Sequence, residues 1–357
     1  MIKKKYLVED TKKNIFFKNK NWAIVLVAQF LLFYTLSKLD FAIQFFSNLF
    51  EWKKRLHIFT FSKFGFSVGD VIYTVVILFL LYSIFIILKK RKSTDLRRIF
   101  LLLNISYFIY QCFWGMLYFQ KPIIEQFKKR EITDQDLKTL AIKYLNLCKA
   151  TREKVTEDRN GIFFINDINA IKQEIITQQA KLPLQITSKA PIKTLSVKPS
   201  LYNQIMNYTG ILGYYNPFTA EAQFNPNLPS TQLPFTLAHE MSHQLGYARE
   251  QEASFIAFLC AKNSQNLDLK YSAQLYVLKS LLRNLAIKNP AFVKQALSQY
   301  SEKMKRDRLN DLNFYKKHDG LLSDVFGITN DLFLKSNQQE GRITYSYFIN
   351  LLIAYEA

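Results

Sequence analysis

An uncharged apolar run limits what this chain can fold into more than any other feature. The run is Val71–Leu88, VIYTVVILFLLYSIFIIL, and it ends abruptly at Lys89-Lys90-Arg91-Lys92. A helix needs about 20 apolar residues to cross the hydrocarbon core of a bilayer. In that environment the backbone must satisfy its own hydrogen bonds, which an α-helix does. The run therefore predicts a transmembrane helix over residues 71–88.

Two more apolar segments predict further membrane spans, over residues 22–39 and 99–119. No small-residue cleavage site follows the first segment, so we interpret it as an anchor. Asn104 and Gln111 interrupt the last segment, and we expect them to face other helices. Between the first two spans, Phe41–Trp52 carries apolar residues at helical spacing, which fits either a core helix or a helix lying on the bilayer surface.

Basic residues predict the orientation of these spans. The segment before the first span holds seven and the 89–98 loop six, against five in the longer 38–70 segment. The positive-inside rule then puts the N-terminus and the 89–98 loop in the cytoplasm and residues 120–357 outside the cytoplasmic membrane. The net charge is +20, of which residues 1–119, with 18 basic and 6 acidic side chains, carry +12. Because the excess flanks the spans, it indicates a lipid bilayer as partner and no nucleic acid.

Residues 120–357 read as a helix-dominated domain with a few strands. Helical patterns cover residues 137–148, 168–176, 270–286, 290–311, 319–335 and 343–355. Strand patterns cover residues 193–197, 210–219 and 222–225. Cys148 and Cys260 lie in helical patterns, where they form either a disulfide or two buried free thiols. The predicted fold is thus a membrane α region (1–119) followed by an α+β domain.

The stretch Phe235–Phe255 holds two of the four histidines, one helical turn apart. On a helix, His239 and His243 face the same side and can bind one metal ion. Glu240 projects beside them, where a carboxylate can take a proton from a water activated by the metal. Pro234 favours a helix start and Gly246 a helix stop on either side of the pair. The HExxH pattern therefore predicts a zinc hydrolase with one ion per chain and Glu240 as general base.

A catalytic zinc needs a third protein ligand, and Arg249-Glu250-Gln251-Glu252-Ala253 offers two carboxylates. This run resembles the RExxAD element that supplies the third ligand in membrane-embedded gluzincin peptidases. The resemblance implies Glu250, although Ser254 stands where that element has an acid and the gap from HExxH is shorter. Glu252 remains the alternative. An arrangement like that of the metzincins is excluded, because their third histidine would fall at Arg249.

Several motifs together resemble one family. They are Trp114–Phe119 at the end of the third span, Gly213–Thr219, Leu233–Gln244, Arg249–Ala253 and Phe66–Asp70. In this combination they are similar to domain of unknown function 3810. That resemblance covers nearly the whole chain and implies a bacterial membrane protein with an N-terminal membrane region and a zincin-like HExxH domain. It implies no substrate.

The function expected from these residues is that of a membrane-anchored zinc metallopeptidase, acting on a peptide or protein of the cell envelope. Tyr214, Tyr215 and Tyr345 are candidate donors to the developing oxyanion or contacts to the substrate. One alternative keeps the metal and hydrolyses another amide, such as that of a cell-wall peptide. The other is a non-enzymatic binding or assembly module of the envelope, with a structural zinc. An open coordination position favours catalysis, because structural zinc sites are closed by four protein ligands.

Overall fold

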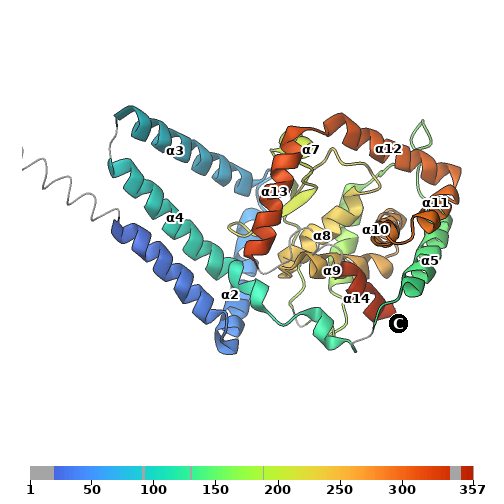
Figure 1. The fold of residues 1–357 in the computed structure, drawn as a ribbon, viewed down its shortest axis with the longest axis horizontal. Helices are drawn as coiled ribbons and strands as arrows, with labels where there is room; N and C mark the ends of the chain where they lie inside the picture. Colours follow the sequence, from blue (N-terminus) through green and yellow to red (C-terminus); the bar gives the residue numbers. More distant parts are fainter. Residues whose placement is uncertain (1–19, 91–92, 129–130, 188, 338–346, 357) are drawn as a thin grey trace, which may run out of the picture. The chain divides into compact units, whose positions relative to one another are not determined.

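The computed structural model describes residues 20–90, 93–128, 131–187, 189–337 and 347–356 (Figure 1). Helices dominate these residues, and the strands form a single small sheet. The chain forms two compact units. Unit 1 comprises residues 1–53 and 68–120, and unit 2 comprises residues 54–67 and 121–357.

Unit 1 consists of long helices that expose apolar side chains. They are the helix Lys20–Leu36, the first part of α2 (Asp40–Phe61), α3 (Val68–Lys90), α4 (Ser93–Phe113) and the short η1 (Gly115–Phe119). Phe33, Phe46 and Met116 form their common core. The side-chain amide of Gln29 donates to Asn104 at 3.1 Å, which confirms that Asn104 faces another helix.

The helix α2 buries one side of its apolar stripe and exposes the other. Ala42, Phe46 and Phe50 are buried, whereas Phe41 and Phe45 are exposed. The two interpretations of the stripe therefore apply to different faces of one helix. One face packs in the core, and the other keeps the apolar surface expected of a helix at a bilayer.

Only α3, among the described residues, is by itself long and apolar enough to cross a membrane, over Val68–Lys89. The predicted span 71–88 is confirmed to this extent. The helix Lys20–Leu36 joins α2 through a bend of 104°, and Leu96–Phe113 joins Gly115–Gln126 through a bend of 44°. If each bent pair forms one span, the total is three.

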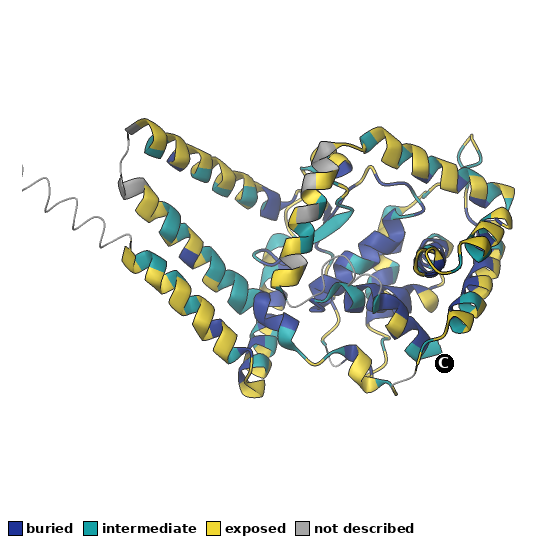
Figure 2. Ribbon diagram, in the orientation of Figure 1, coloured by how far each residue is buried: buried dark blue, intermediate teal, exposed yellow. Residues whose placement is uncertain are grey.

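Unit 2 is a helical domain around a buried helix pair, α8 and α9 (Figure 1). Nearly every residue of both helices is buried, as Figure 2 shows in dark blue. The packing of α10 against both α5 and α8 completes the core. The elements are η2 (Ile123–Gln126), α5 (Asp134–Arg152), α6 (Ile168–Gln179), α7 (Asn203–Thr209), α8 (Leu233–Leu245), α9 (Glu250–Lys262), α10 (Leu267–Leu285), α11 (Pro290–Ser298), α12 (Glu302–His318), α13 (Leu321–Ser336) and α14 (Tyr347–Glu356).

Within the described residues, the helical patterns of the sequence are found at the expected places with one exception; residues 343–346 of the predicted helix 343–355 lie outside those residues. The predicted helix over 290–311 is wrong, because two helices, α11 and α12, divide this stretch. Ser301 causes the break, since its hydroxyl accepts a hydrogen bond from Met304 N and thereby starts α12. Cys148 and Cys260 are both free and buried, so the free-thiol alternative is confirmed.

The sheet contains β1 (Val197–Pro199), β2 (Gly213–Asn216) and β3 (Glu221–Phe224) in the order β1-β3-β2. β1 runs parallel and β2 antiparallel to β3, and Gly213 pairs with Phe224. The predicted strand at 193–197 is shifted, since β1 begins only at Val197. Both β2 and β3 pack against α8, so the sheet lines the helix that carries the HExxH motif.

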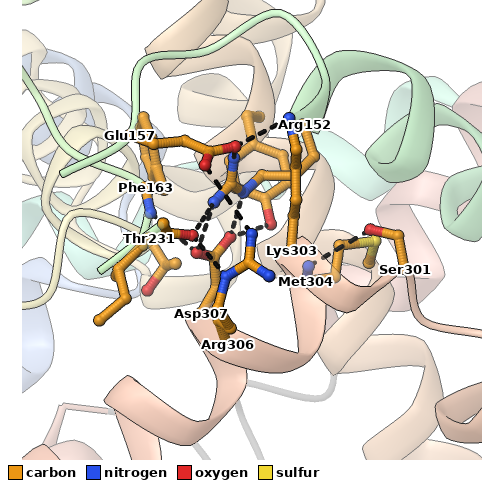
Figure 3. Close-up of polar contacts among 12 residues, drawn as sticks. Arg152, Glu157, Phe163, Thr231, Ser301, Lys303, Met304, Arg306 and Asp307 are labelled. Carbon is orange, nitrogen blue, oxygen red and sulfur yellow. Dashed lines mark hydrogen bonds and ion pairs between the residues drawn. The ribbon is translucent and has the colours of Figure 1, made fainter. Parts of the chain in front are cut away.

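A buried ion-pair network joins α5, α10 and α12 on another side of unit 2 (Figure 3). The fully buried guanidinium of Arg152 donates from Nε and Nη2 to the carboxylate of Asp307, at 2.6 and 3.0 Å. Tyr271 OH and Phe163 N donate to the same carboxylate. Because each of these charges has several partners, we assign the network a structural role.

Candidate metal centre

The helix α8 holds both histidines of the motif. Pro234 stands in its first turn, and Gly246 ends it with a left-handed φ of 117°. The helix stop predicted at Gly246 is thereby confirmed. His239 and His243 lie on one face, with ring centroids 4.7 Å apart and ring planes at 89°.

The first turn of α9 adds a carboxylate to this pair. Glu250 Oε2 lies 3.1 Å from His239 Nε2, and Glu250 Oε1 lies 3.6 Å from His243 Nε2. One ligand atom from each of the three residues lies within 4.8 Å of the other two. The short turn through Gly246 folds α9 back on α8 and so brings the carboxylate to the imidazoles.

The donor types of these three side chains and the two distances from Glu250 to the imidazoles suit a tetrahedral zinc ion. Zinc binds histidine nitrogen and carboxylate oxygen at about 2.0–2.2 Å, so neighbouring ligand atoms in a tetrahedron lie roughly 3.3 Å apart. The observed separations of 3.1 and 3.6 Å lie on either side of that value. Two imidazoles and one carboxylate are also the donor types that zinc accepts, and they leave one coordination position open.

Each histidine is oriented through its other ring nitrogen. His243 Nδ1 lies 2.6 Å from the backbone oxygen of Tyr247, which can only accept, so Nδ1 carries a proton and Nε2 faces Glu250. His239 Nδ1 lies 3.1 Å from Ser254 Oγ, and this hydroxyl lies 3.2 Å from Tyr276 OH. Both contacts present Nε2 to Glu250, as a metal site requires.

Glu240 lies beside the cluster in a dry position. Its side chain is buried, and its Oε2 has no hydrogen-bond partner among the described residues. Burial raises the pKa of Glu240 to about 8, although the charge of His243 acts in the opposite direction. The carboxyl group thus titrates close to neutral pH, as an acid–base group does.

In the absence of metal, the cluster is stabilised by the attraction between protonated His243 and the carboxylate of Glu250. Burial lowers the pKa of His243, but Glu250 and Glu240 outweigh it and raise the value to about 9. Burial likewise acts to raise the pKa of Glu250, yet the two histidines hold it well below its usual range. The pKa of His239 is lowered, chiefly by burial. A metal cation would replace the proton that His243 shares with Glu250.

A family model described as a protein of unknown function (DUF3810) matches residues 45–353. The chain belongs to the DUF3810 family. The resemblance predicted from the sequence motifs is therefore confirmed. No curated protein and no solved structure matches the chain. In this DUF3810 member the matched region contains the histidine–glutamate cluster, together with α3 and α4.

The two candidate third ligands of the DUF3810 chain lie in different environments. Glu250 joins the histidines, whereas Glu252 is buried on another face of α9. There Glu252 Oε1 accepts hydrogen bonds from Ile123 N at 2.8 Å and from Arg249 Nη1 at 3.1 Å. Glu252 thus ties η2 to α9 and is absent from the cluster.

The candidate tyrosines of this DUF3810 member fall in three places. Tyr214 points to the far face of the sheet, where its hydroxyl lies 3.4 Å from Ser200 Oγ. Tyr215 is buried on the face that it shares with Gly213, and Gly213 contacts Glu240. Tyr345 lies outside the described residues. Of the described pair, only Tyr215 is on the Glu240 side of the sheet.

Sequence reasoning overlooked two contributors to the centre of the DUF3810 chain, namely Tyr276 and the Tyr247 carbonyl, and it singled out Gly213 only as part of the motif Gly213–Thr219. The contacts of Gly213 and Tyr276 with the centre act across long sequence separations, so no local signal predicts them. The Tyr247 carbonyl is different, because a backbone oxygen four residues after His243 is expected wherever Gly246 ends the helix. Ser254 was noticed only as a departure from the RExxAD pattern.

Proposed function

We propose that this DUF3810 protein is a membrane-anchored, zinc-dependent metallopeptidase with a zincin-like domain of the gluzincin type. The observation that carries the proposal is the convergence of His239, His243 and Glu250 within 4.8 Å, beside the buried Glu240. These three would hold the ion, and Glu240 is placed for proton transfer. A structural zinc site would instead use a fourth protein ligand.

When bound, the zinc ion supplies a Lewis acid that makes a water molecule more acidic and polarises a substrate carbonyl. The carboxylate of Glu240 takes a proton from the attacking water and later delivers it to the leaving nitrogen. Of the two candidate tyrosines that the structure describes, Tyr215 lies on the same side of the sheet as Glu240 and is our candidate donor to the developing oxyanion.

Unit 2 is built from two separate segments of the chain, and this supports more than one membrane span. Residues 54–67 and 121–357 belong to this one compact unit and hence lie on one side of the bilayer. If α3 crosses the bilayer, the chain must cross again before residue 121. Leu96–Phe113 with Gly115–Gln126 is the apolar helix pair in that interval. With the helix Lys20–Leu36 as a third span, the positive-inside count favours unit 2 outside the cytoplasmic membrane.

Metal content and hydrolysis test this function in the detergent-solubilised full chain, because unit 2 includes residues 54–67. We expect about one zinc per chain, and zinc-dependent release of new amino termini from a mixture of denatured proteins. Glu240→Gln should keep the zinc and lose hydrolysis. A chain that folds without retaining zinc refutes the metallopeptidase. A wild-type chain that binds zinc and hydrolyses no amide refutes catalysis.

A further inference from the structure

The segment 54–67 gives unit 2 an apolar and basic surface of its own. Leu56, Phe59, Phe64 and Phe66 are 44–63% exposed. Lys63 lies 4.1 Å above the ring of Phe59. Exposed aromatic rings next to lysine or arginine are typical of protein surface in the headgroup region of a bilayer. We call residues 54–67 the interfacial segment. Its last residue, Ser67, directly precedes Val68, where α3 begins.

Three buried polar side chains fix the interfacial segment to the rest of unit 2. Lys54 Nζ donates to the backbone oxygens of Ala190 and Leu245, each at 3.0 Å. Lys198 Nζ donates to Phe61 O at 2.7 Å and Phe66 O at 2.9 Å, and it pairs with Glu221 at 2.6 Å. The side-chain amide of Gln223 bonds the hydroxyl of Ser67 at 2.9 Å. Separating the segment from the rest of unit 2 would break the hydrogen bonds of Lys54 and would leave the buried ammonium group of Lys198 with only Glu221 of its three partners, which is costly.

These contacts end on the elements that build the metal centre. Leu245 is the last residue of α8, two positions after His243. Gln223 on β3 pairs with Tyr214, the neighbour of Gly213, and Gly213 contacts Glu240. The interfacial segment is therefore connected to the helix end on one side of the centre and to the sheet on the other.

The contact path from Glu240 through the sheet to Ser67 is short. Each step is a strand spacing of about 4.8 Å or a side-chain contact of similar length, so the whole path is on the order of 20 Å, and the straight distance from Glu240 to Ser67 is at most of that length. An extended peptide covers 20 Å with roughly six residues.

We propose that the substrates of this centre are polypeptides tethered to the same bilayer, by a transmembrane helix or a lipid, and cut about 6–10 residues from the tether. This inference rests on the proposed metallopeptidase function and adds the class of substrate. The headgroup region holds the interfacial segment, and the rigid contacts hold the centre at a fixed height above it. A tethered chain meets the centre at a high effective concentration, which a dissolved peptide does not.

Vesicles test the substrate class. The full chain is reconstituted with zinc in phosphatidylcholine–phosphatidylglycerol vesicles. It receives a degenerate library of roughly 12-residue peptides, long enough to reach beyond the proposed cut. One half of the library carries a C-terminal palmitoyl-lysine and the other half a plain lysine. Mass spectrometry identifies the new peptide termini, and the Glu240→Gln variant measures the background without catalysis. We expect the palmitoylated half to be cut at least about tenfold faster, with cuts clustered at the proposed distance from the lipid.

Each outcome decides one of the two proposals. Equal rates for both halves, or cuts spread evenly along the palmitoylated peptides, overturn the tethered-substrate inference and leave the metallopeptidase standing. If neither half is cut faster than in the Glu240→Gln control, the proposed metallopeptidase function is refuted, and the proposed substrate class is refuted with it.

A fluorescence measurement tests the interfacial segment without any catalysis. In a Cys112→Ser background a fluorophore is attached at Phe64→Cys, or at Ile287→Cys as the exposed control, while Cys148 and Cys260 stay buried. Nitroxide lipids should quench the label at position 64 and spare the label at position 287. Equal quenching at the two positions, or none at position 64, overturns the placement of the segment and with it the inference.

Discussion

Gly213 on β2 packs directly against the side chain of Glu240 on α8. A methyl group added to Gly213 would lie 2.6 Å from Glu240 Cγ and 2.7 Å from the backbone oxygen of Gln223. Real Cβ atoms do not approach other atoms so closely, and the Gln223 oxygen belongs to the paired strand and cannot rotate away. The sheet thus forms one wall of the position in which Glu240 acts, and glycine is required there because of the close approach.

Replacement of Gly213 by alanine should therefore displace Glu240 and spare the metal ligands. We expect hydrolysis to fall by about 100-fold, because a misplaced catalytic group loses that much, and stability to fall by about 1–3 kcal/mol from overpacking. Zinc content should not change. Gly320→Ala is the matched control, since a Cβ at Gly320 meets no atom within 4 Å. Zinc loss in Gly213→Ala would show that the wall supports the ligands instead.

The raised pKa of Glu240 makes the stability of the zinc-free chain depend on pH. Below its ordinary pKa of about 4.5 the group is protonated in both folded and unfolded chains and contributes nothing. Between 4.5 and about 8 only the unfolded chain releases the proton, so the folded state loses stability as the pH rises.

Glu240→Gln removes this penalty. The variant should match the wild type near pH 4.5 and exceed it on the order of 4 kcal/mol near pH 8, at about 1.4 kcal/mol per pKa unit. Urea unfolding of the chelated proteins measures the difference. A gap that stays constant from pH 5 to pH 8 contradicts the assigned titration.

Glu250 and Glu252 should respond oppositely to the same substitution. Glu250→Gln removes a ligand and should weaken zinc binding by at least about 10- to 100-fold. Glu252→Gln should keep the zinc but destabilise the fold by about 1–3 kcal/mol, because Ile123 N and Arg249 lose a charged acceptor. Zinc titration and unfolding of both variants measure the two effects. A stronger loss of zinc in Glu252→Gln would assign the third ligand to Glu252.

Local signals in the sequence were sufficient for α8 and for the shared face of its histidines. Helical periodicity alone predicts that His239 and His243 share one face. The preference of glycine for a left-handed helix end alone predicts that α8 stops at Gly246. Glu250 and Glu252 both fall in the first turn of α9, so spacing alone could not separate them. The two glutamates differ because the backbone N–H of Ile123, 129 positions earlier in the chain, donates a hydrogen bond to Glu252.

Contacts between distant residues account for what the sequence could not predict. Lys54 was counted only as a loop charge between two spans, yet its ammonium group reaches Leu245 O, 191 positions along the chain. Nothing near Lys54 distinguishes a buried lysine from a solvated one. The apolar stripe of α2 was recognisable from Phe41 and Phe45, because apolar residues at helical spacing are a local pattern, and both side chains are exposed.

The network around Asp307 should support the fold without affecting the metal. Asp307→Asn removes the buried carboxylate that accepts two hydrogen bonds from the Arg152 guanidinium and leaves the partly exposed Glu157 as its remaining anion, and the expected loss of stability is about 3–5 kcal/mol. The zinc affinity of the chain that remains folded should equal that of the wild type. Glu302→Gln is the control, because its pair with Lys305 lies on the exposed surface, where solvent screens it and its contribution to stability is small. Weakened zinc binding in folded Asp307→Asn would show coupling between the network and α8.

Ser254 should set the affinity of the metal through His239. Its hydroxyl lies between His239 Nδ1, at 3.1 Å, and Tyr276 OH, at 3.2 Å, so it holds the ring with Nε2 directed at Glu250. Ser254→Ala removes this contact, and we expect zinc affinity to fall by about tenfold. Tyr276→Phe keeps Ser254 and the stacking on Phe235, so its effect should be smaller. Competition with a chromogenic chelator measures both affinities. If Ser254→Ala binds zinc as tightly as the wild type, the ring of His239 is held by its helix alone, and the hydroxyl serves only the packing of α9 against α10.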